Sequence, residues 1–148
     1  MAVEDSGSSG TAAGSPLPRL LCDTAELVSL GGDTPAGALW KLAEPGRQLD
    51  ANVVRLPAGE RVDTHTEPDL DVLLLVLGGE ARLDSADGGH LLRAGSLTWL
   101  PHGSTRAVLA GPDGVTYLTV HRRRPGMRIQ PPEAAERLRR SLDGGDGL

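Results

Sequence analysis

The chain has 148 residues, a formal net charge of −5 at pH 7, and no Phe, one Tyr and two Trp. This length suits one domain. The acidic balance and the scarcity of aromatic side chains argue against a surface for nucleic acid or for an anionic membrane. The opening MAVEDSGSSG lacks the apolar region of a secretory signal, and the longest apolar run, residues 72–77, is too short to span a bilayer. We therefore expect a cytoplasmic single-domain protein, in which Cys22, the lone cysteine, cannot form an internal disulfide.

The two ends of the chain differ from its middle. Residues 1–18 are rich in Ser, Gly, Ala and Pro without a periodic apolar face, which predicts a disordered tail. Residues 22–30 could form a short helix capped by Asp23. Residues 131–148 predict a short C-terminal helix and tail with a Gly-rich stop. The folded domain is expected over residues 19–130.

Strand-length apolar or alternating runs fill the middle of the chain, separated by Gly, Pro and Asp. They are ALWKLA, ANVVRL, RVDTH, DVLLLVL, EARLD, HLLRA, SLTWL, STRAVL and VTYLTVH. Segments of this length and spacing, without a helical crossover between them, predict an antiparallel barrel or sandwich. Asp87 and Gly88 suit the tip of a hairpin that joins 80–84 to 90–94.

The run from Asp71 to Leu77 is apolar on both faces of a strand. We expect Leu73 and the other odd-numbered residues to fill the barrel. Val72 and the even-numbered residues then need a second cover, which is either another sheet of this chain or a partner subunit. A homodimer is therefore the expected assembly, with burial inside one sandwich as the alternative.

Two stretches have a regular spacing of glycine, proline and polar residues. They are GERVDTHTEPDLDVLLLVLG, which begins at Gly59, and GSLTWLPHGSTRAVLA, which begins at Gly95. They resemble the paired motifs of the cupin superfamily, G-x5-H-x-H-x3-E-x6-G and G-x5-P-x-G-x2-H-x3-N. The resemblance covers residues 39–121 and implies a small, all-β cupin, a double-stranded β-helix (jelly-roll barrel) with short terminal helices. The motif glycines are expected where chain reversals need open φ/ψ space; they are Gly59, Gly78, Gly95 and Gly103.

The chain departs from these motifs at the metal ligands. In metal-binding cupins three histidines and one glutamate hold the ion, and here only His65 is kept. Glu67 and Asp71 stand where the second histidine and the glutamate would be, and Arg106 replaces the last histidine. A guanidinium stays protonated and cannot serve as a ligand, so no metal is favoured and Arg106 is expected to pair with Glu67 or Asp71. A divalent transition metal on His65, Glu67 and Asp71 is the alternative, completed by His121 or His102.

These departures lead to a prediction of function. An Arg in an apolar barrel suits recognition of a carboxylate or phosphate, so we expect small-molecule binding of an organic anion without the usual metal centre. The expected ligand-binding residues are His65, Glu67, Asp71, Trp99, Arg106, Tyr117 and His121. A polar network without chemistry is the alternative for this set, and Trp99 and Tyr117 could equally be core residues.

Whether the protein is an enzyme stays open at this stage. One alternative function is a metal-independent isomerase, epimerase or cyclase, with His65, Asp71 and His121 as catalytic candidates and His65 as the general base. The other is a metal-dependent cupin dioxygenase with an altered ligand set. The basic run 122–124 is expected to be a solvated face, and the single lysine, Lys41, hints at a GC-rich bacterial genome.

Overall fold

The computed structural model describes residues 16–32 and 34–124. Most of the predicted N-terminal tail and the whole of the predicted C-terminal helix lie outside the described residues. Residues 16–22, which are described, have no regular secondary structure. Within the described ranges, no helix is both long enough and apolar enough to cross a membrane.

One short helix precedes seven strands. The helix α1 (Thr24–Ser29) is capped by Asp23, whose side chain accepts a hydrogen bond from the backbone N of Ala25 at 2.9 Å, which confirms the predicted cap. The strands are β1 (Gly37–Lys41), β2 (Leu49–Leu56), β3 (Arg61–Thr66), β4 (Val72–Ser85), β5 (Gly88–Arg93), β6 (Leu97–Leu100) and β7 (Thr105–Arg122).

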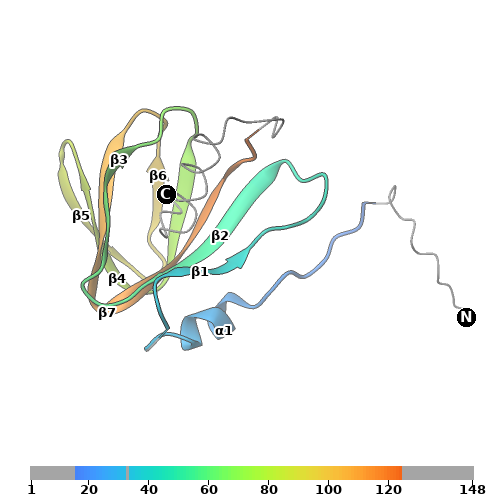
Figure 1. Ribbon diagram of the computed structural model, residues 1–148, viewed down its shortest axis with the longest axis horizontal. Coiled ribbons are helices and arrows are strands. Elements are labelled where there is room, and N and C mark those ends of the chain that lie inside the picture. The colour runs from blue at the N-terminus through green and yellow to red at the C-terminus, as the bar shows by residue number, and fades with distance from the viewer. Residues whose placement is uncertain (1–15, 33, 125–148) are drawn as a thin grey trace, which may run out of the picture.

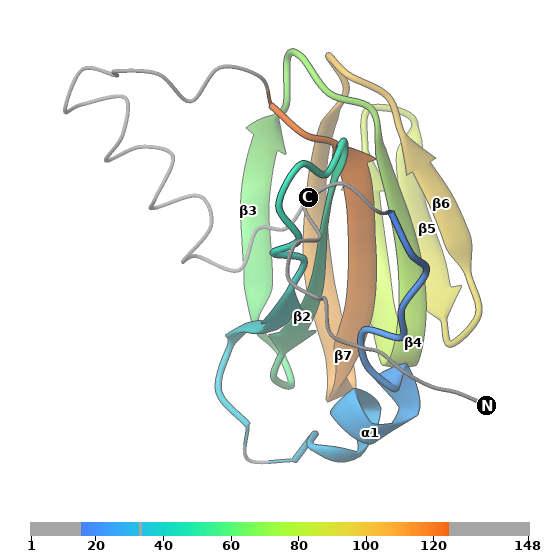
Figure 2. The same cartoon turned by 90° about the vertical axis from the view of Figure 1, so that its right-hand side faces the viewer.

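The two long strands β4 and β7 organise the barrel. The first half of β4 pairs with β6 and with the second half of β7, whereas its second half pairs with β5 and the first half of β7. All pairs are antiparallel. One continuous sheet therefore folds over into two walls, β1-β2-β7-β4-β6 and β3-β7-β4-β5, which face each other in Figure 1. Figure 2 shows β5 and β6 on one side of this barrel and β3 on the other. The predicted all-β jelly roll is confirmed.

Glycines in β4 allow this strand to pass from one wall of the barrel to the other. At Gly79 φ is +78°, and a Cβ would lie 2.1 Å from the carbonyl oxygen of Gly114 in β7. Gly78 was expected to need open φ/ψ space, and this was wrong: it is not among the glycines with positive φ. A Cβ on Gly78 would instead lie 2.6 Å from a methyl group of Val28, so this glycine lets α1 pack closely against β4. The other motif glycines do have positive φ; they are Gly59, Gly95 and Gly103.

The predicted hairpin is confirmed, whereas the predicted inner face of β4 is wrong. Ser85 pairs with Gly88, so Ala86 and Asp87 form the two-residue turn between β4 and β5, one residue earlier than the predicted tip at Asp87 and Gly88. In the first half of β4 the even-numbered residues are the buried ones, with Val72, Leu74 and Val76 each 1 % exposed, while Leu73 is 45 % exposed. Because both faces of this strand are apolar, hydrophobic alternation alone could not distinguish the inner from the outer face.

Candidate functional site

Arg106 lies in the first half of β7, on the inner side of the barrel. Its Cα partners are His65 of β3 and Ser85 of β4. Residues directly opposite one another in an antiparallel sheet project from the same face, so these three residues stand side by side on one wall. Arg106 is only 1 % exposed.

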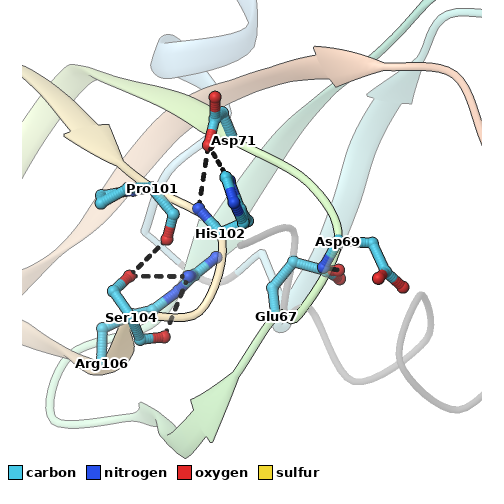
Figure 3. Close-up of polar contacts among 7 residues, drawn as sticks. All are labelled: Glu67, Asp69, Asp71, Pro101, His102, Ser104 and Arg106. Carbon is cyan, nitrogen blue, oxygen red and sulfur yellow. Dashed lines mark hydrogen bonds and ion pairs between the residues drawn. The ribbon is translucent and has the colours of Figure 1, made fainter.

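The guanidinium of Arg106 is held by the loop that precedes its strand. Its Nη1 donates hydrogen bonds to Ser104 Oγ at 3.1 Å and to Ser104 O at 3.3 Å, as Figure 3 shows. Burial lowers the pKa of Arg106, and attraction to the carboxylate of Glu67 opposes that change. A guanidinium nevertheless stays protonated at neutral pH, so a fixed positive charge lies inside the barrel.

Glu67 follows β3, and each of its two carboxylate oxygens has a polar partner. Oε2 accepts a hydrogen bond from the backbone N of Asp69 at 2.8 Å, and Oε1 forms an ion pair with Arg124. Burial of Glu67 raises its pKa, but the Asp69 hydrogen bond and Arg124 outweigh burial, and the pKa is lowered overall. Arg124 belongs to the basic region that we had interpreted as a solvated face. That interpretation missed this residue, because nothing in a run of arginines shows which of them turns inward.

Asp71 does not pair with Arg106. Its Oδ1 accepts hydrogen bonds from the backbone N of His102 at 2.9 Å and from His102 Nδ1 at 2.8 Å (Figure 3). The backbone hydrogen bond, followed by the side-chain one, lowers the pKa of Asp71. Both residues are exposed, so the expected convergence of Asp71 with Arg106 inside the barrel is wrong. The reason is that the 101–104 turn brings His102 within reach of Asp71.

The other two predicted histidines are held by backbone oxygens. His65 Nδ1 lies 2.9 Å from the carbonyl oxygen of Asp63, and His121 Nδ1 lies 2.8 Å from that of Arg122. A ring nitrogen facing a carbonyl oxygen must carry the proton, which leaves the opposite Nε2 of each ring as the acceptor. Both rings are half-buried.

A cleft of about 920 Å³ opens between the edge strands β5 and β6. Leu83, Leu92 and Leu100 line its apolar interior, and Ser104 and Arg106 line one end. Trp99 is at its exposed rim, whereas Tyr117 is 1 % exposed and belongs to the hydrophobic core. Ser85, Asp87 and His90, which no sequence motif indicated, also line the cleft. A cleft of this kind can hold an organic molecule whose charged group reaches Arg106.

No protein-family model matches the sequence, and no curated protein matches it either. Many solved structures do match in fold. A cupin-2 domain protein from Shewanella frigidimarina is 17 % identical, with a TM-score of 0.55 over 70 % of this chain and 95 % of its own. The cupin domain of Schizosaccharomyces pombe Cnp3 is 16 % identical, with a TM-score of 0.52 over 70 % and 66 %. The protein has the cupin fold.

A third similar structure is a sugar phosphate isomerase of the cupin superfamily from Silicibacter pomeroyi. It is 25 % identical, with a TM-score of 0.50 over 53 % of each chain. The chain therefore spans about half the length of that protein. The matches confirm the fold that the paired motifs predicted.

Within the described ranges, the residues of this protein do not form a set that fits a divalent metal. Across residues 16–32 and 34–124, no three His, Cys, Asp or Glu side chains come together in a group that could hold an ion. Among the three conceivable ligands, Asp71 bonds to His102, and Glu67 bonds to Arg124. Arg106 is the Cα partner of His65 and places a positive charge beside it. The alternative of a metal bound by His65, Glu67 and Asp71 is not supported by these contacts.

Proposed function

We propose that this cupin binds a small organic anion, a carboxylate or a phosphate, at the Arg106 end of the cleft and without a metal centre. The observation that carries the proposal is a buried guanidinium at one end of a cleft of about 920 Å³ whose interior is lined by leucines. The planar fork of a guanidinium matches the oxygens of a carboxylate or phosphate. Because Arg106 is only 1 % exposed, water screens its charge less than it screens that of a surface arginine, which strengthens such an ion pair.

Two features bear on the class of anion. The cleft volume lies within the range of about 300–1,000 Å³ that is usual for small-molecule pockets, which leaves room for more than a lone phosphate ion. The similarity to a sugar phosphate isomerase makes phosphorylated sugars the first compounds to test. Asp87 is an acidic residue in the lining of the cleft. It lies at the turn between β4 and β5, where its carboxylate accepts a hydrogen bond from Ser85 Oγ at 2.6 Å.

Binding can be tested by calorimetry and thermal shift with ribose 5-phosphate, succinate and inorganic phosphate as probes. We expect at least one probe to bind, and Arg106→Gln to weaken it by about 10- to 100-fold through the loss of charge-assisted hydrogen bonds. Arg106→Lys, which keeps the charge, serves as a second variant if the Gln variant folds poorly. Arg61→Gln changes a half-exposed arginine on β3 that pairs with Asp63 and is the matched control. Probe binding that is indifferent to both Arg106 variants would contradict the proposal, as would failure of every probe to bind.

A second candidate function is metal-independent isomerisation of the bound anion, because His65 is the Cα partner of Arg106 at one end of the cleft. His102 and His65 each have Nδ1 held by an oxygen, of Asp71 and of the Asp63 backbone respectively, which leaves Nε2 as a proton acceptor. This reading predicts that the C2 proton of ribose 5-phosphate exchanges with D2O in the presence of the protein, followed by NMR. Loss of exchange in His65→Gln or in His102→Gln would identify the base. Absence of exchange when ribose 5-phosphate is bound would rule out this function.

A further inference from the structure

The lining of the cleft changes from apolar to polar along the wall formed by β5, β4 and β7. Leu92 and Leu83, which both line the cleft, are 6 % and 3 % exposed. Alternate residues of a strand return to the same face of the sheet, so Ser85 follows Leu83 on the inner face of β4. There Ser85 is the Cα partner of Arg106 in β7. Along this wall the lining is therefore apolar at one end and polar at the end where Arg106 lies.

Asp87, in the turn between β4 and β5, adds a negative charge to the polar end. It lines the cleft, and its Oδ1 accepts a hydrogen bond from the hydroxyl of Ser85 at 2.6 Å. This hydrogen bond is the largest of the effects that lower the pKa of Asp87, so the carboxylate is charged at neutral pH. Within the part of the chain that the structure describes, no arginine, lysine or histidine forms an ion pair with Asp87. The wall of the cleft thus carries a carboxylate that no cationic side chain neutralises.

Ser85 connects the two charged residues of the cleft. It is the Cα partner of Arg106, and its hydroxyl donates to Asp87. Neighbouring strands are about 4.8 Å apart, so one small molecule can reach both charges. Glu67, the other carboxylate near Arg106, is not among the residues that line the cleft, and it is paired with Arg124. A molecule in the cleft therefore meets the guanidinium of Arg106 together with the carboxylate of Asp87.

We propose that the anion bound by this protein is a zwitterion, with its acidic group at Arg106, a protonated amine at Asp87 and an apolar body against the leucines of the cleft. This inference rests on the proposed function and narrows it to one class of ligand, of which amino acids with apolar side chains are the simplest members. A plain anion of the same shape is attracted by Arg106 but repelled by Asp87. An anion that also carries an amine complements both charges, and such complementarity favours one ligand over another.

Calorimetry of the full chain with three probes that share one apolar body tests this inference. L-Leucine carries both charges, 4-methylpentanoate lacks the amine, and 3-methylbutylamine lacks the carboxylate. We expect leucine to bind about two- to fivefold more tightly than 4-methylpentanoate, a modest preference because Asp87 is exposed and water screens its charge. The amine should bind most weakly, because it lacks the group that Arg106 holds. High salt should reduce the preference for leucine over 4-methylpentanoate.

Variants of the charged residues assign this preference. Asp87→Asn removes the charge but keeps an oxygen for the Ser85 hydroxyl, and Asn is favoured in turns, so the variant should fold. It should abolish the preference for leucine without weakening 4-methylpentanoate, whereas Arg106→Gln should weaken both. Asp84→Asn is the matched control. It makes the same change of charge at a residue of β4 that pairs with Arg82 and is not among the residues that line the cleft, so both affinities should stay unchanged.

The outcomes separate this inference from the proposed function. Equal binding of leucine and 4-methylpentanoate, with both dependent on Arg106, overturns the inference and leaves the proposed function intact. A preference for leucine that survives in Asp87→Asn has the same consequence, and so does binding of ribose 5-phosphate by a protein that does not bind leucine. If no carboxylate or phosphate probe binds, the proposed function fails, and this inference fails with it.

Discussion

At the scale of single residues, Thr119 is a polar group that the fold buries at a cost. Its side chain is 0 % exposed, and its Oγ1 has no hydrogen-bond partner within the described part of the chain. We expect Thr119→Val to raise the free energy of unfolding by about 1 kcal/mol, because valine keeps the shape and removes an unsatisfied hydroxyl. Urea denaturation measures the change.

Ser104 provides the opposite case for comparison. Its hydroxyl donates to the carbonyl oxygen of Pro101 at 2.7 Å and accepts from Arg106. Ser104→Ala should therefore lower the free energy of unfolding by about 1 kcal/mol. If Thr119→Val destabilised the protein as much as Ser104→Ala does, Thr119 Oγ1 would have a partner in solution.

The pair Asp71–His102 predicts a dependence of stability on pH. The pKa of Asp71 is lowered in the folded protein, so its contribution to stability is fully present above its unfolded pKa, near 4, and is lost as pH falls through the lower folded value. Asp71→Asn should therefore reduce the urea midpoint at neutral pH, and the difference from the unmodified chain should shrink below about pH 4. Asp69→Asn, in the same loop, is the control. A difference that stayed constant down to pH 2 would rule out Asp71 as the titrating group.

Motif spacing predicted the place of Arg106 but not the partners of its neighbours. A residue inside a strand has its side chain directed by alternation, so Arg106 and His65 could be assigned to one barrel from the sequence. Glu67 and Asp71 lie in the loop between β3 and β4, where no periodic rule applies. Their partners, Arg124 and His102, depend on how two loops and the end of β7 meet in space.

At the scale of elements, the bend in β4 depends on Gly79. Two effects make a side chain at this position unfavourable. The backbone has a left-handed φ of +78°, and any Cβ would lie 2.1 Å from Gly114 O. Gly59 has a similar φ of +75° with open space around it. Gly59→Ala should therefore lower the free energy of unfolding by about 1–2 kcal/mol through backbone strain alone, whereas Gly79→Ala should cost clearly more or prevent folding. Equal effects in thermal or urea denaturation would contradict a close approach of β4 and β7.

The elements themselves were largely predictable because each strand is short and bounded by turn residues. Two pairs of expected strands proved continuous, since 71–77 with 80–84 form β4, and 104–109 with 115–121 form β7. The glycines between them had suggested chain reversals. They instead mark irregularities at which a strand passes from one wall to the other, and at one of them residues 111–114 of β7 oppose the single residue Glu80.

At the scale of the whole molecule, the two walls share β4 and β7, so neither wall can unfold while the other keeps its central strands. Leu74 in the β6 wall and Leu83 in the β5 wall are both almost fully buried. We expect Leu74→Ala and Leu83→Ala each to lower the free energy of unfolding by about 2–4 kcal/mol, through lost burial and a cavity. Both should shift one and the same transition, because β4 connects the walls.

Tryptophan emission reports the wall with β1 and β6, which carry Trp40 and Trp99, whereas far-ultraviolet circular dichroism reports all strands. The two signals should coincide in urea for the unmodified chain and both variants. A variant in which emission and dichroism change at different urea concentrations would show that the walls unfold separately, and the shared strands would then not make the barrel one cooperative unit.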